Sequence, residues 1–156
     1  MPLVWRLAAA VFACAAVFGL TLGTMKPAAT YQAATPPKEL VQSFENLAFI
    51  QRMPQDAVTT YLAADFVDHD PLSGGTRADY LNRLIALAAS GSESREIKRL
   101  IAEGPFVVVH LRQLRPSGQR PLAVVDIYRV ASGRIAEHWS ISEPVTEGGQ
   151  NRLGAF

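Results

Sequence analysis

The feature that most constrains the fold is a change in the spacing of apolar residues near Gly91. Before this glycine, apolar side chains recur every three or four residues, which is the spacing of one face of an α-helix. After it, apolar and polar residues alternate, which is typical of half-buried β-strands. The sequence therefore predicts an α+β fold, in which helices come first and pack on one face of a curved antiparallel sheet formed by hairpin-linked strands.

Three helices are expected in the first part of the chain. The spacing predicts the first from Pro37 to Ile50 and the second over 54–64, which begins with a proline. The third is expected from Thr76 to Ser90, with the threonine as its N-cap. Between the second and third helices, residues 66–71 end in a proline, which disfavours helix in the residue before it, so we expect the chain to turn there.

Four strands are expected in the second part, because turn signals rich in Gly, Pro and Ser separate runs of alternating residues. These strands are predicted near 96–102, 106–115, 121–130 and 134–142.

The N-terminus differs in composition from the rest of the chain. An uncharged, mostly apolar run extends from Leu7 to Met25, close to the roughly 20 residues needed to cross a bilayer. We expect 1–25 to be a signal peptide or an N-terminal membrane anchor, and 26–37, rich in Pro, Ala and Thr, to be a flexible tether. The protein is therefore expected to be exported, as a periplasmic, secreted or membrane-anchored protein. One folded domain is predicted over 38–145, followed by a loose tail over 146–156.

Charge and cysteine content exclude several classes of protein. The formal net charge is +1, so the basic patch of a nucleic-acid-binding protein is missing and we expect no nucleic-acid partner. The only cysteine, Cys14, lies inside the apolar N-terminal run, which excludes an intrachain disulfide, a CxxC redox centre and a thiolate zinc site. Lipid modification of Cys14 is an alternative, but the bulky Phe12 argues against it.

Asp126 is the most informative polar residue, because aspartate is rare in a strand as apolar as 122–128. Alternation puts Asp126 on the face of Val124 and Tyr128, and antiparallel pairing with the next strand brings His138 close to it. A buried aspartate either has a raised pKa or is held ionised by an imidazolium, and both states suit proton transfer near neutral pH. The alternative is an internal Asp126–His138 pair with a purely structural role.

The three histidines are further candidates for proton transfer, although a hydrogen-bonded structural role is the alternative for each. His69 lies in the expected turn, and His110 and His138 lie in the middle of strands. Together with Asp126 they offer ligand types suited to zinc or iron, but the chain has no local ligand spacing, so we expect no metal. No glycine-rich phosphate loop or HExxH motif occurs in the sequence, and we expect no cofactor.

Three blocks of the sequence resemble those of SnoaL-like proteins. They are Phe66-Val67-Asp68-His69-Asp70-Pro71, Val124-Val125-Asp126-Ile127-Tyr128-Arg129 and Gly133-Arg134-Ile135-Ala136-Glu137-His138-Trp139. The resemblance covers roughly Pro37 to Val145, with the blocks in the right order. The SnoaL-like family is part of the superfamily that also holds ketosteroid isomerase, scytalone dehydratase and nuclear transport factor two.

The resemblance implies a conical α+β fold, in which three N-terminal helices packed on a curved antiparallel sheet enclose a mostly apolar pocket. In such proteins, acids and histidines that line the pocket move protons on a hydrophobic substrate. The catalytic candidates here are Asp126, His110, His138 and His69. The candidate substrate-binding residues are Tyr128, Ser140, Tyr61 and Phe66.

One position departs from the family's pattern. The catalytic aspartate of the polyketide cyclases directly follows the His-Trp pair, whereas this chain has Ser140 there. A serine cannot replace that acid or base. Asp126 stands where those cyclases carry a histidine, so the proton-transfer group has either moved to the adjacent strand or been lost. Polyketide cyclisation itself is therefore not the expected reaction.

Three functions remain compatible with the sequence. The first is cofactor-free acid–base chemistry, of the isomerase, dehydratase, cyclase or hydrolase type, on a small hydrophobic carbonyl compound, with Asp126 as base. The second is a noncatalytic extracytoplasmic module that binds a lipophilic small molecule, which Ser140 and the leader favour. The third is an assembly domain whose sheet face forms a homodimer, with Trp139 and Ile141 in the interface.

Overall fold

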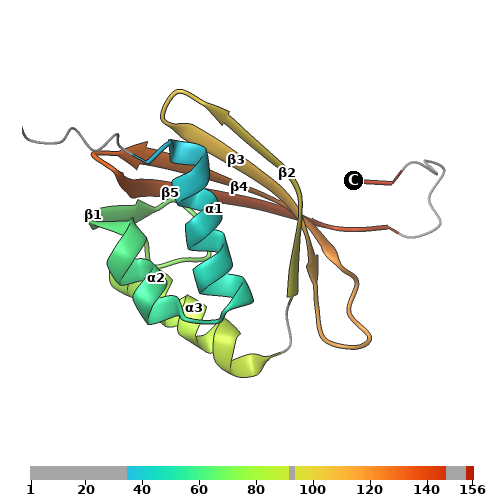
Figure 1. Ribbon diagram of the computed structural model, residues 1–156. Helices are drawn as coiled ribbons and strands as arrows, with labels where there is room; N and C mark the ends of the chain where they lie inside the picture. The colour runs from blue at the N-terminus through green and yellow to red at the C-terminus, as the bar shows by residue number, and fades with distance from the viewer. Residues whose placement is uncertain (1–34, 92–93, 147–153) are drawn as a thin grey trace, which may run out of the picture. The chain divides into compact units, whose positions relative to one another are not determined.

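The computed structural model describes residues 35–91, 94–146 and 154–156 (Figure 1). The predicted signal peptide or anchor over 1–25 lies outside these residues, as does the predicted tether up to residue 34. The first helix begins at Pro37, next to the predicted start of the domain. Within these three described ranges, no helix is both long and apolar enough to span a membrane.

The first two helices lie where the sequence predicts them but end differently. α1 (Pro37–Glu45) continues directly into the π-helical segment η1 (Asn46–Ile50), so the predicted helix has the expected extent while its last part is wider than an α-helix. α2 (Pro54–Tyr61) ends before the predicted residue 64, because Leu62 is already extended, with φ −88° and ψ 144°.

The third helix, α3 (Arg77–Ser90), confirms the prediction at both ends. The Thr76 hydroxyl accepts a hydrogen bond from the Asp79 backbone N–H at 3.2 Å, and the Asp79 carboxylate accepts one from the Thr76 N–H at 3.3 Å. These reciprocal bonds form a capping box. The helix stops at Gly91, whose φ of +61° is the left-handed conformation that glycine adopts without a steric penalty.

The sheet contains the four predicted strands and one more, in the order β1-β5-β4-β3-β2. All neighbouring strands are antiparallel except β1 and β5, which are parallel. The sheet is therefore antiparallel over β2 to β5, as the sequence predicted, and the parallel β1 makes it mixed. Its strands are β1 (Leu62–Asp68), β2 (Ser94–Glu103), β3 (Phe106–Leu114), β4 (Leu122–Ala131) and β5 (Arg134–Pro144).

The additional strand, β1, occupies part of the stretch that was predicted to turn. Its buried residues, Leu62, Phe66 and Asp68, are an even number of positions apart, but its sequence LAADFVD does not alternate between apolar and polar residues, which was the signal for the other strands. Its pairing with β5 also changes register between Leu62 and Val67, as at a bulge. The consequence for the site is that β1 ends with Asp68 opposite His138.

The helices cover one face of the sheet (Figure 1), and the core lies between the two layers. Inward-facing residues alternate along β3 and β4, as the sequence predicted. The α+β class is confirmed. The buried apolar residues are Leu40, Val41, Phe44, Ala48, Ala57, Val58, Leu62, Phe66, Tyr80, Leu84, Val107, Val109, Leu111, Val124, Tyr128, Val130 and Ile135.

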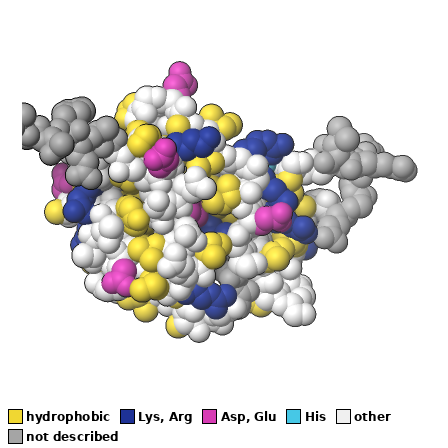
Figure 2. All heavy atoms as spheres, viewed as in Figure 1, with side chains coloured by type: hydrophobic (Ala, Val, Ile, Leu, Met, Phe, Trp, Pro, Cys, Tyr) yellow, Lys and Arg dark blue, Asp and Glu magenta, His cyan; other side chains and the backbone are white. Residues whose placement is uncertain are grey.

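The surface shown in Figure 2 mixes side-chain types. Lys and Arg side chains lie among Asp and Glu side chains and small groups of apolar ones. This view therefore has the mixed charge of an ordinary protein surface.

Candidate functional site

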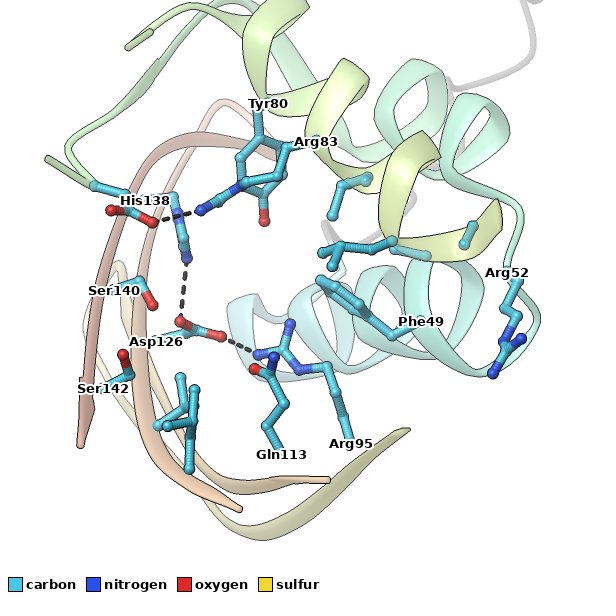
Figure 3. Close-up of a pocket in the computed structure, with 17 residues that line it drawn as sticks. Phe49, Arg52, Tyr80, Arg83, Arg95, Gln113, Asp126, His138, Ser140 and Ser142 are labelled. Atoms are coloured by element: carbon cyan, nitrogen blue, oxygen red, sulfur yellow. Dashed lines mark hydrogen bonds and ion pairs between the residues drawn. The ribbon is translucent and has the colours of Figure 1, made fainter. Parts of the chain in front are cut away.

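A pocket of about 230 Å³ lies between the helices and the sheet. One wall is formed by apolar residues of η1 and α3, among them Phe49, Leu84 and Leu87. The sheet contributes Asp126 from β4 and His138 and Ser140 from β5 (Figure 3). The pocket thus has an apolar side and a side rich in hydrogen-bonding groups.

Asp126 lies on the inner face of β4, as alternation predicted. It is only 3% exposed and pairs directly with Ser140 across the strands, while Tyr128 pairs with His138. All four residues therefore face the same side of the sheet. The predicted approach of Asp126 and His138 is confirmed, because Asp126 Oδ1 lies 3.4 Å from His138 Nε2.

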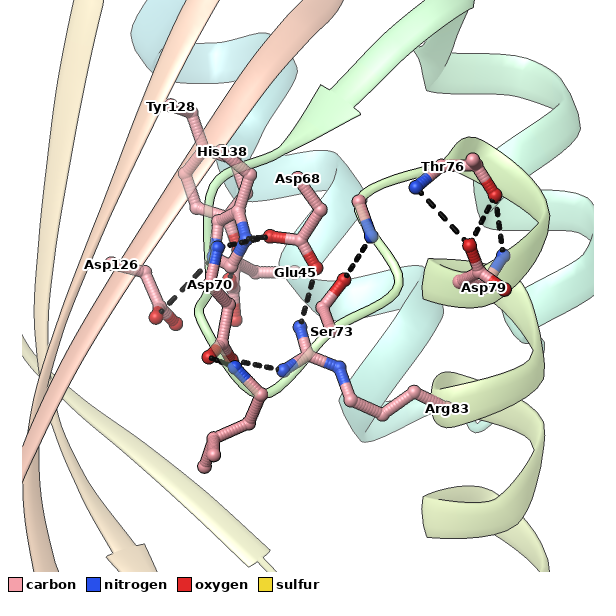
Figure 4. A network of polar contacts seen from close by, with 12 residues as sticks. Glu45, Asp68, Asp70, Ser73, Thr76, Asp79, Arg83, Asp126, Tyr128 and His138 are labelled. Carbon is pink, nitrogen blue, oxygen red and sulfur yellow. Dashed lines mark hydrogen bonds and ion pairs between the residues drawn. The ribbon is translucent and has the colours of Figure 1, made fainter.

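His138 lies between two carboxylates (Figure 4). Its Nδ1 is 2.8 Å from Oδ1 of Asp68, whose side chain is fully buried. Its Nε2 is close to Asp126 but makes no hydrogen bond of good geometry with any residue that the structure describes. His138 is thus fixed through Nδ1 by a residue of β1, and Nε2 is left facing the pocket.

The charges of these groups depend on burial and on their neighbours. Burial disfavours the charged form of His138, but the nearby carboxylates of Asp126 and Asp68 together outweigh burial and raise its pKa. Burial also opposes ionisation of Asp126, yet Arg95 and His138 hold its pKa well below the usual range. Burial also opposes ionisation of Asp68, but the hydrogen bonds from His138, Ser73 and the Asp70 backbone together with the charge of His138 outweigh burial, and its pKa is lowered. These shifts favour an imidazolium between two carboxylates.

Arg95 of β2 supplies the second positive charge in the pocket wall. It forms an ion pair with Asp126, and its Nη1 lies 3.6 Å from Oε2 of Glu45 in α1. Its guanidinium also stacks over the ring of Phe49 at 3.9 Å. Arg95 therefore connects the sheet wall to the helices and keeps Asp126 ionised.

Tyr80 and Arg83, one turn apart on α3, complete the inner end of the pocket (Figure 3). Arg83 Nη2 lies 3.3 Å from Asp68, and Arg83 also forms an ion pair with Asp70. The Tyr80 ring packs 5.1 Å from the imidazole of His138. Burial raises the pKa of Tyr80, so its hydroxyl stays protonated. In the described part of the chain, no residue hydrogen-bonds this hydroxyl, which points into the pocket.

Tyr128 lies behind the pocket wall instead of lining the pocket. It is fully buried and donates a hydrogen bond of 2.5 Å to Oε1 of Glu45. Burial raises the pKa of Glu45, although Arg95 opposes this. Tyr128 was predicted to contact substrate, and the structure gives it a structural role between the sheet and α1 (Figure 4).

Two predicted catalytic histidines lie on the other face of the sheet. His69 bonds Oε2 of Glu137 at 2.8 Å and stacks on Trp139 with ring centroids 4.5 Å apart. Glu137 and Trp139 flank His138 in the chain, so alternation turns them away from the pocket. His110 lies between the inward-facing Val109 and Leu111. These positions exclude His69 and His110 from chemistry in this pocket.

His110 instead contacts residues of the outer face. Its Nδ1 lies 3.0 Å from Nη1 of Arg99, and its ring stacks on Phe156 at 5.5 Å. The predicted loose tail over 146–156 therefore includes one residue that contacts the sheet. Residues 147–153 lie outside the described residues.

Two predicted substrate-binding residues belong to the core. Phe66 is 3% exposed and packs against Tyr80 at 5.1 Å, and Tyr61 packs against Phe44 at 6.4 Å. Neither lines the pocket, so they shape it only through their neighbours. Ser140 is the predicted substrate-binding residue that does line the pocket.

Seven polar residues that line the pocket, and one buried acid beside them, were not predicted from the sequence. The acid is Asp68, which stood in the motif around His69 but was assigned to a turn. Tyr80 was expected on the apolar face of the third helix, and its hydroxyl gave no separate signal. The missed polar pocket residues are Arg52, Asp70, Tyr80, Arg83, Arg95, Gln113 and Ser142.

Among the residues that the structure describes, no three His, Cys, Asp or Glu side chains come together in a way that holds a metal ion.

The architecture is that of a helix-covered, curved sheet with an internal pocket, and the sequence assigns it to a family. Residues 41–138 match the model of the SnoaL-like domain. This is more than half of the chain, which therefore belongs to the SnoaL-like family. The matched region includes Asp126 and His138 and ends before Ser140. No curated protein sequence is similar enough to count as a relative.

Solved structures show the same fold at low sequence identity. IdmH from Streptomyces antibioticus, proposed to be a polyketide cyclase, is 17% identical with a TM-score of 0.57, over 70% of this chain and 93% of that one. A protein from Kribbella flavida, proposed to be a ketosteroid isomerase, is 20% identical with a TM-score of 0.58, over 74% and 84%. An NTF2-like protein of unknown function from Cytophaga hutchinsonii is 17% identical with a TM-score of 0.58, over 70% and 91%. These likenesses establish the fold and leave the activity open.

Proposed function

We propose that the domain binds a small, mostly apolar carbonyl compound in this pocket and transfers protons on it without a cofactor. The volume of about 230 Å³ suits a compound smaller than a typical drug molecule. The apolar side formed by η1 and α3 suits the hydrocarbon part, and the polar groups of the sheet suit an oxygen.

One observation carries this proposal. His138 Nε2 and the Tyr80 hydroxyl are two hydrogen-bond donors at the inner end of the pocket. Nε2 is buried and makes no well-aligned hydrogen bond with a described residue, although Asp126 Oδ1 lies 3.4 Å away, and the Tyr80 hydroxyl points into the pocket. A buried donor without a partner costs about 1–3 kcal/mol, so such donors are normally satisfied. A carbonyl oxygen bound here accepts from both, and both then stabilise the negative charge that develops on it when a neighbouring C–H bond breaks.

In the proposed reaction, the C–H bond next to the carbonyl breaks and its proton moves to the Asp126 carboxylate. The electron pair shifts to the carbonyl oxygen, which receives a proton from His138 and becomes an enol. Return of the two protons restores both residues. A substrate with a second double bond conjugated with the enol gives an isomer, because Asp126 can then deliver its proton to the far end of the conjugated system. Asp126 Oδ1 and His138 Nε2 are 3.4 Å apart, which is close enough for both residues to act on one small substrate.

The ion pair with Arg95 restricts the substrate. Because Arg95 and His138 lower the pKa of Asp126, this carboxylate is a weak base. We therefore expect turnover only of carbon acids that are already activated, such as a carbon flanked by a carbonyl and an aromatic ring.

Deuterium uptake by 2-tetralone in D₂O, followed by NMR, tests the proposal. The wild-type domain should speed exchange at the carbon between the carbonyl and the ring, and Asp126→Asn and His138→Gln should each lower this rate by a factor on the order of 10² or more. His110→Gln, the same change on the outer face, is the matched control and should leave the rate unchanged. If the wild type exchanges no faster than Asp126→Asn, the catalytic proposal fails.

A noncatalytic binding module is the second candidate. Two observations favour it, namely the ion pair that makes Asp126 a weak base and the serine at position 140. This function requires that 2-naphthol, an analogue of the enol of 2-tetralone, binds in the pocket while 2-tetralone undergoes no catalysed exchange.

A further inference from the structure

Glu45 of α1 is a buried acid that the proposed reaction does not use. It is 2% exposed and does not line the pocket, so it does not touch a bound substrate. Its Oε1 accepts a hydrogen bond of 2.5 Å from the Tyr128 hydroxyl, and its Oε2 lies 3.6 Å from Nη1 of Arg95. Both oxygens of Glu45 therefore face groups that stabilise a negative charge.

Arg95 connects Glu45 to the proposed base. Its Nη2 forms an ion pair with Oδ2 of Asp126 (Figure 3), while its Nη1 faces Glu45. Two carboxylates thus share one guanidinium, on a side chain that is only 10% exposed. A single positive charge cannot fully compensate both, so the charge of one carboxylate affects the basicity of the other.

The direction of this effect follows from the surroundings of Glu45. Burial raises the pKa of Glu45, Arg95 opposes burial, and the negative charge of Asp126 raises the pKa further. The repulsion between two carboxylates is mutual, so an ionised Glu45 makes Asp126 a stronger base. The titratable or charged groups that face Glu45 are Arg95 of β2, Asp126 and Tyr128 of β4, His138 of β5 and Tyr80 of α3.

We propose that Glu45 is a positioning residue for proton transfer, which shares Arg95 with Asp126 and, when ionised, strengthens Asp126 as the base. This inference rests on the proposed function, because it requires Asp126 to accept the proton from the substrate. The pKa of Asp126 is held well below the usual range, so Asp126 is already ionised where Glu45 titrates. A change of rate with pH in that range is therefore due to Glu45.

The pH profile of deuterium uptake by 2-tetralone tests this role. After subtraction of the uncatalysed rate, wild-type exchange should increase roughly three- to tenfold as Glu45 ionises, at a pH above its ordinary pKa of 4.5. Exchange should decrease again at higher pH as His138 loses its proton. Glu45→Gln should remove the increase and keep the rate at its low-pH level. Glu39→Gln, the same change at an exposed position of α1, is the control and should retain the increase.

Tyr128→Phe provides a test in which Glu45 itself is kept. This variant removes the hydroxyl that stabilises ionised Glu45, so the pKa of Glu45 should rise. The increase in exchange rate should then move to higher pH by about one unit, the effect of one hydrogen bond to a charged group. A purely structural role of Glu45 and Tyr128 would lower the melting temperatures of both variants and leave the pH profile in place.

The outcomes separate the two proposals. If the wild type speeds exchange but Glu45→Gln keeps the increase with pH, or Tyr128→Phe does not shift it, the role of Glu45 is wrong and the proposed function stands. If the wild type exchanges no faster than Asp126→Asn at any pH, both proposals fail. If Glu45→Gln does not fold, the shift in Tyr128→Phe decides, because a shift to higher pH supports the role of Glu45 and an unshifted profile overturns it.

Discussion

The two faces of the sheet each hold a histidine paired with an acid, but in opposite solvent environments. On the inner face, His138 is 2% exposed and lies between the carboxylates of Asp68 and Asp126. On the outer face, the His69 side chain is 37% exposed and pairs with Glu137, which is itself bound by Arg129. Each face thus pairs a histidine with an acid at 2.8 Å.

The two pairs differ in their exposure to water. An ion pair in contact with water is screened and contributes little, whereas a buried one cannot lose a partner without leaving a charge uncompensated. Hydrogen-bond length therefore does not separate a functional histidine from a surface one. Burial and the number of charged neighbours do.

The largest expected effect comes from Arg95. Arg95→Met leaves Asp126 and Glu45 without their buried cation, and we expect the free energy of unfolding to fall by about 3–5 kcal/mol. Arg99→Met removes an exposed arginine beside His110 on the outer face and should cost no more than about 1 kcal/mol. Urea denaturation of both variants measures the difference. Equal losses would show that the inner network is no more important than a surface pair.

The second effect concerns the acid beside each histidine. Asp68→Asn removes the carboxylate bound to His138 Nδ1, so the pKa of His138 should fall and the domain should lose about 1–3 kcal/mol. Glu137→Gln is the matched change beside His69 and should cost less than about 1 kcal/mol. NMR titration of the imidazole protons and urea denaturation give both quantities. An unchanged His138 titration in Asp68→Asn would contradict the geometry described here.

The pH dependence of stability provides a third test. The folded-state pKa of His138 is raised above 6.5, so its contribution is complete below about pH 6.5 and is lost as the pH rises through the folded-state value. The pKa of Asp126 is lowered from 3.8, so its contribution is complete above about pH 4 and is lost as the pH falls. Stability should be greatest between about pH 4 and 6.5. His138→Gln should remove the decline above this window.

The smallest effect is expected at His69. His69→Gln removes the bond to Glu137 and the stacking on Trp139, and should lower the free energy of unfolding by about 1 kcal/mol or less. Binding of 2-naphthol should not change, because His69 lies on the other face. A loss of binding would place His69 in the pocket and overturn the assignment of faces.

The sequence predicted those parts of the fold that have strong local signals. The capping box at Thr76 and the turns between β2, β3, β4 and β5 depend on neighbouring residues, and they lie where predicted. β1 was missed because it pairs in parallel with a strand that lies some 70 residues later in the chain, and its sequence has neither a hairpin turn nor an alternation of apolar and polar residues.

For the site as well, residues with a local sequence signal were predicted and those without one were missed. Burial of Asp126 could be predicted because the residue lies in an apolar strand. The alternation of side chains then predicted that His138 lies beside it. His110 was misassigned because Phe106–Val109 is apolar on both faces, so this run does not reveal which face the next residue takes. Arg95 contacts Asp126, and Asp68 contacts His138, only because the folded chain brings distant strands together. No local sequence pattern predicts these contacts.

Binding of 2-naphthol to wild type and to Tyr80→Phe is the most direct test of the central claim, that His138 and Tyr80 together hold a ligand oxygen. The variant loses one hydroxyl and keeps the ring that packs on His138, so its fold should persist. We expect the Kd for 2-naphthol to rise roughly three- to tenfold in Tyr80→Phe, with no change for naphthalene, which has no oxygen. Equal Kd values for 2-naphthol in the two proteins would contradict the claim.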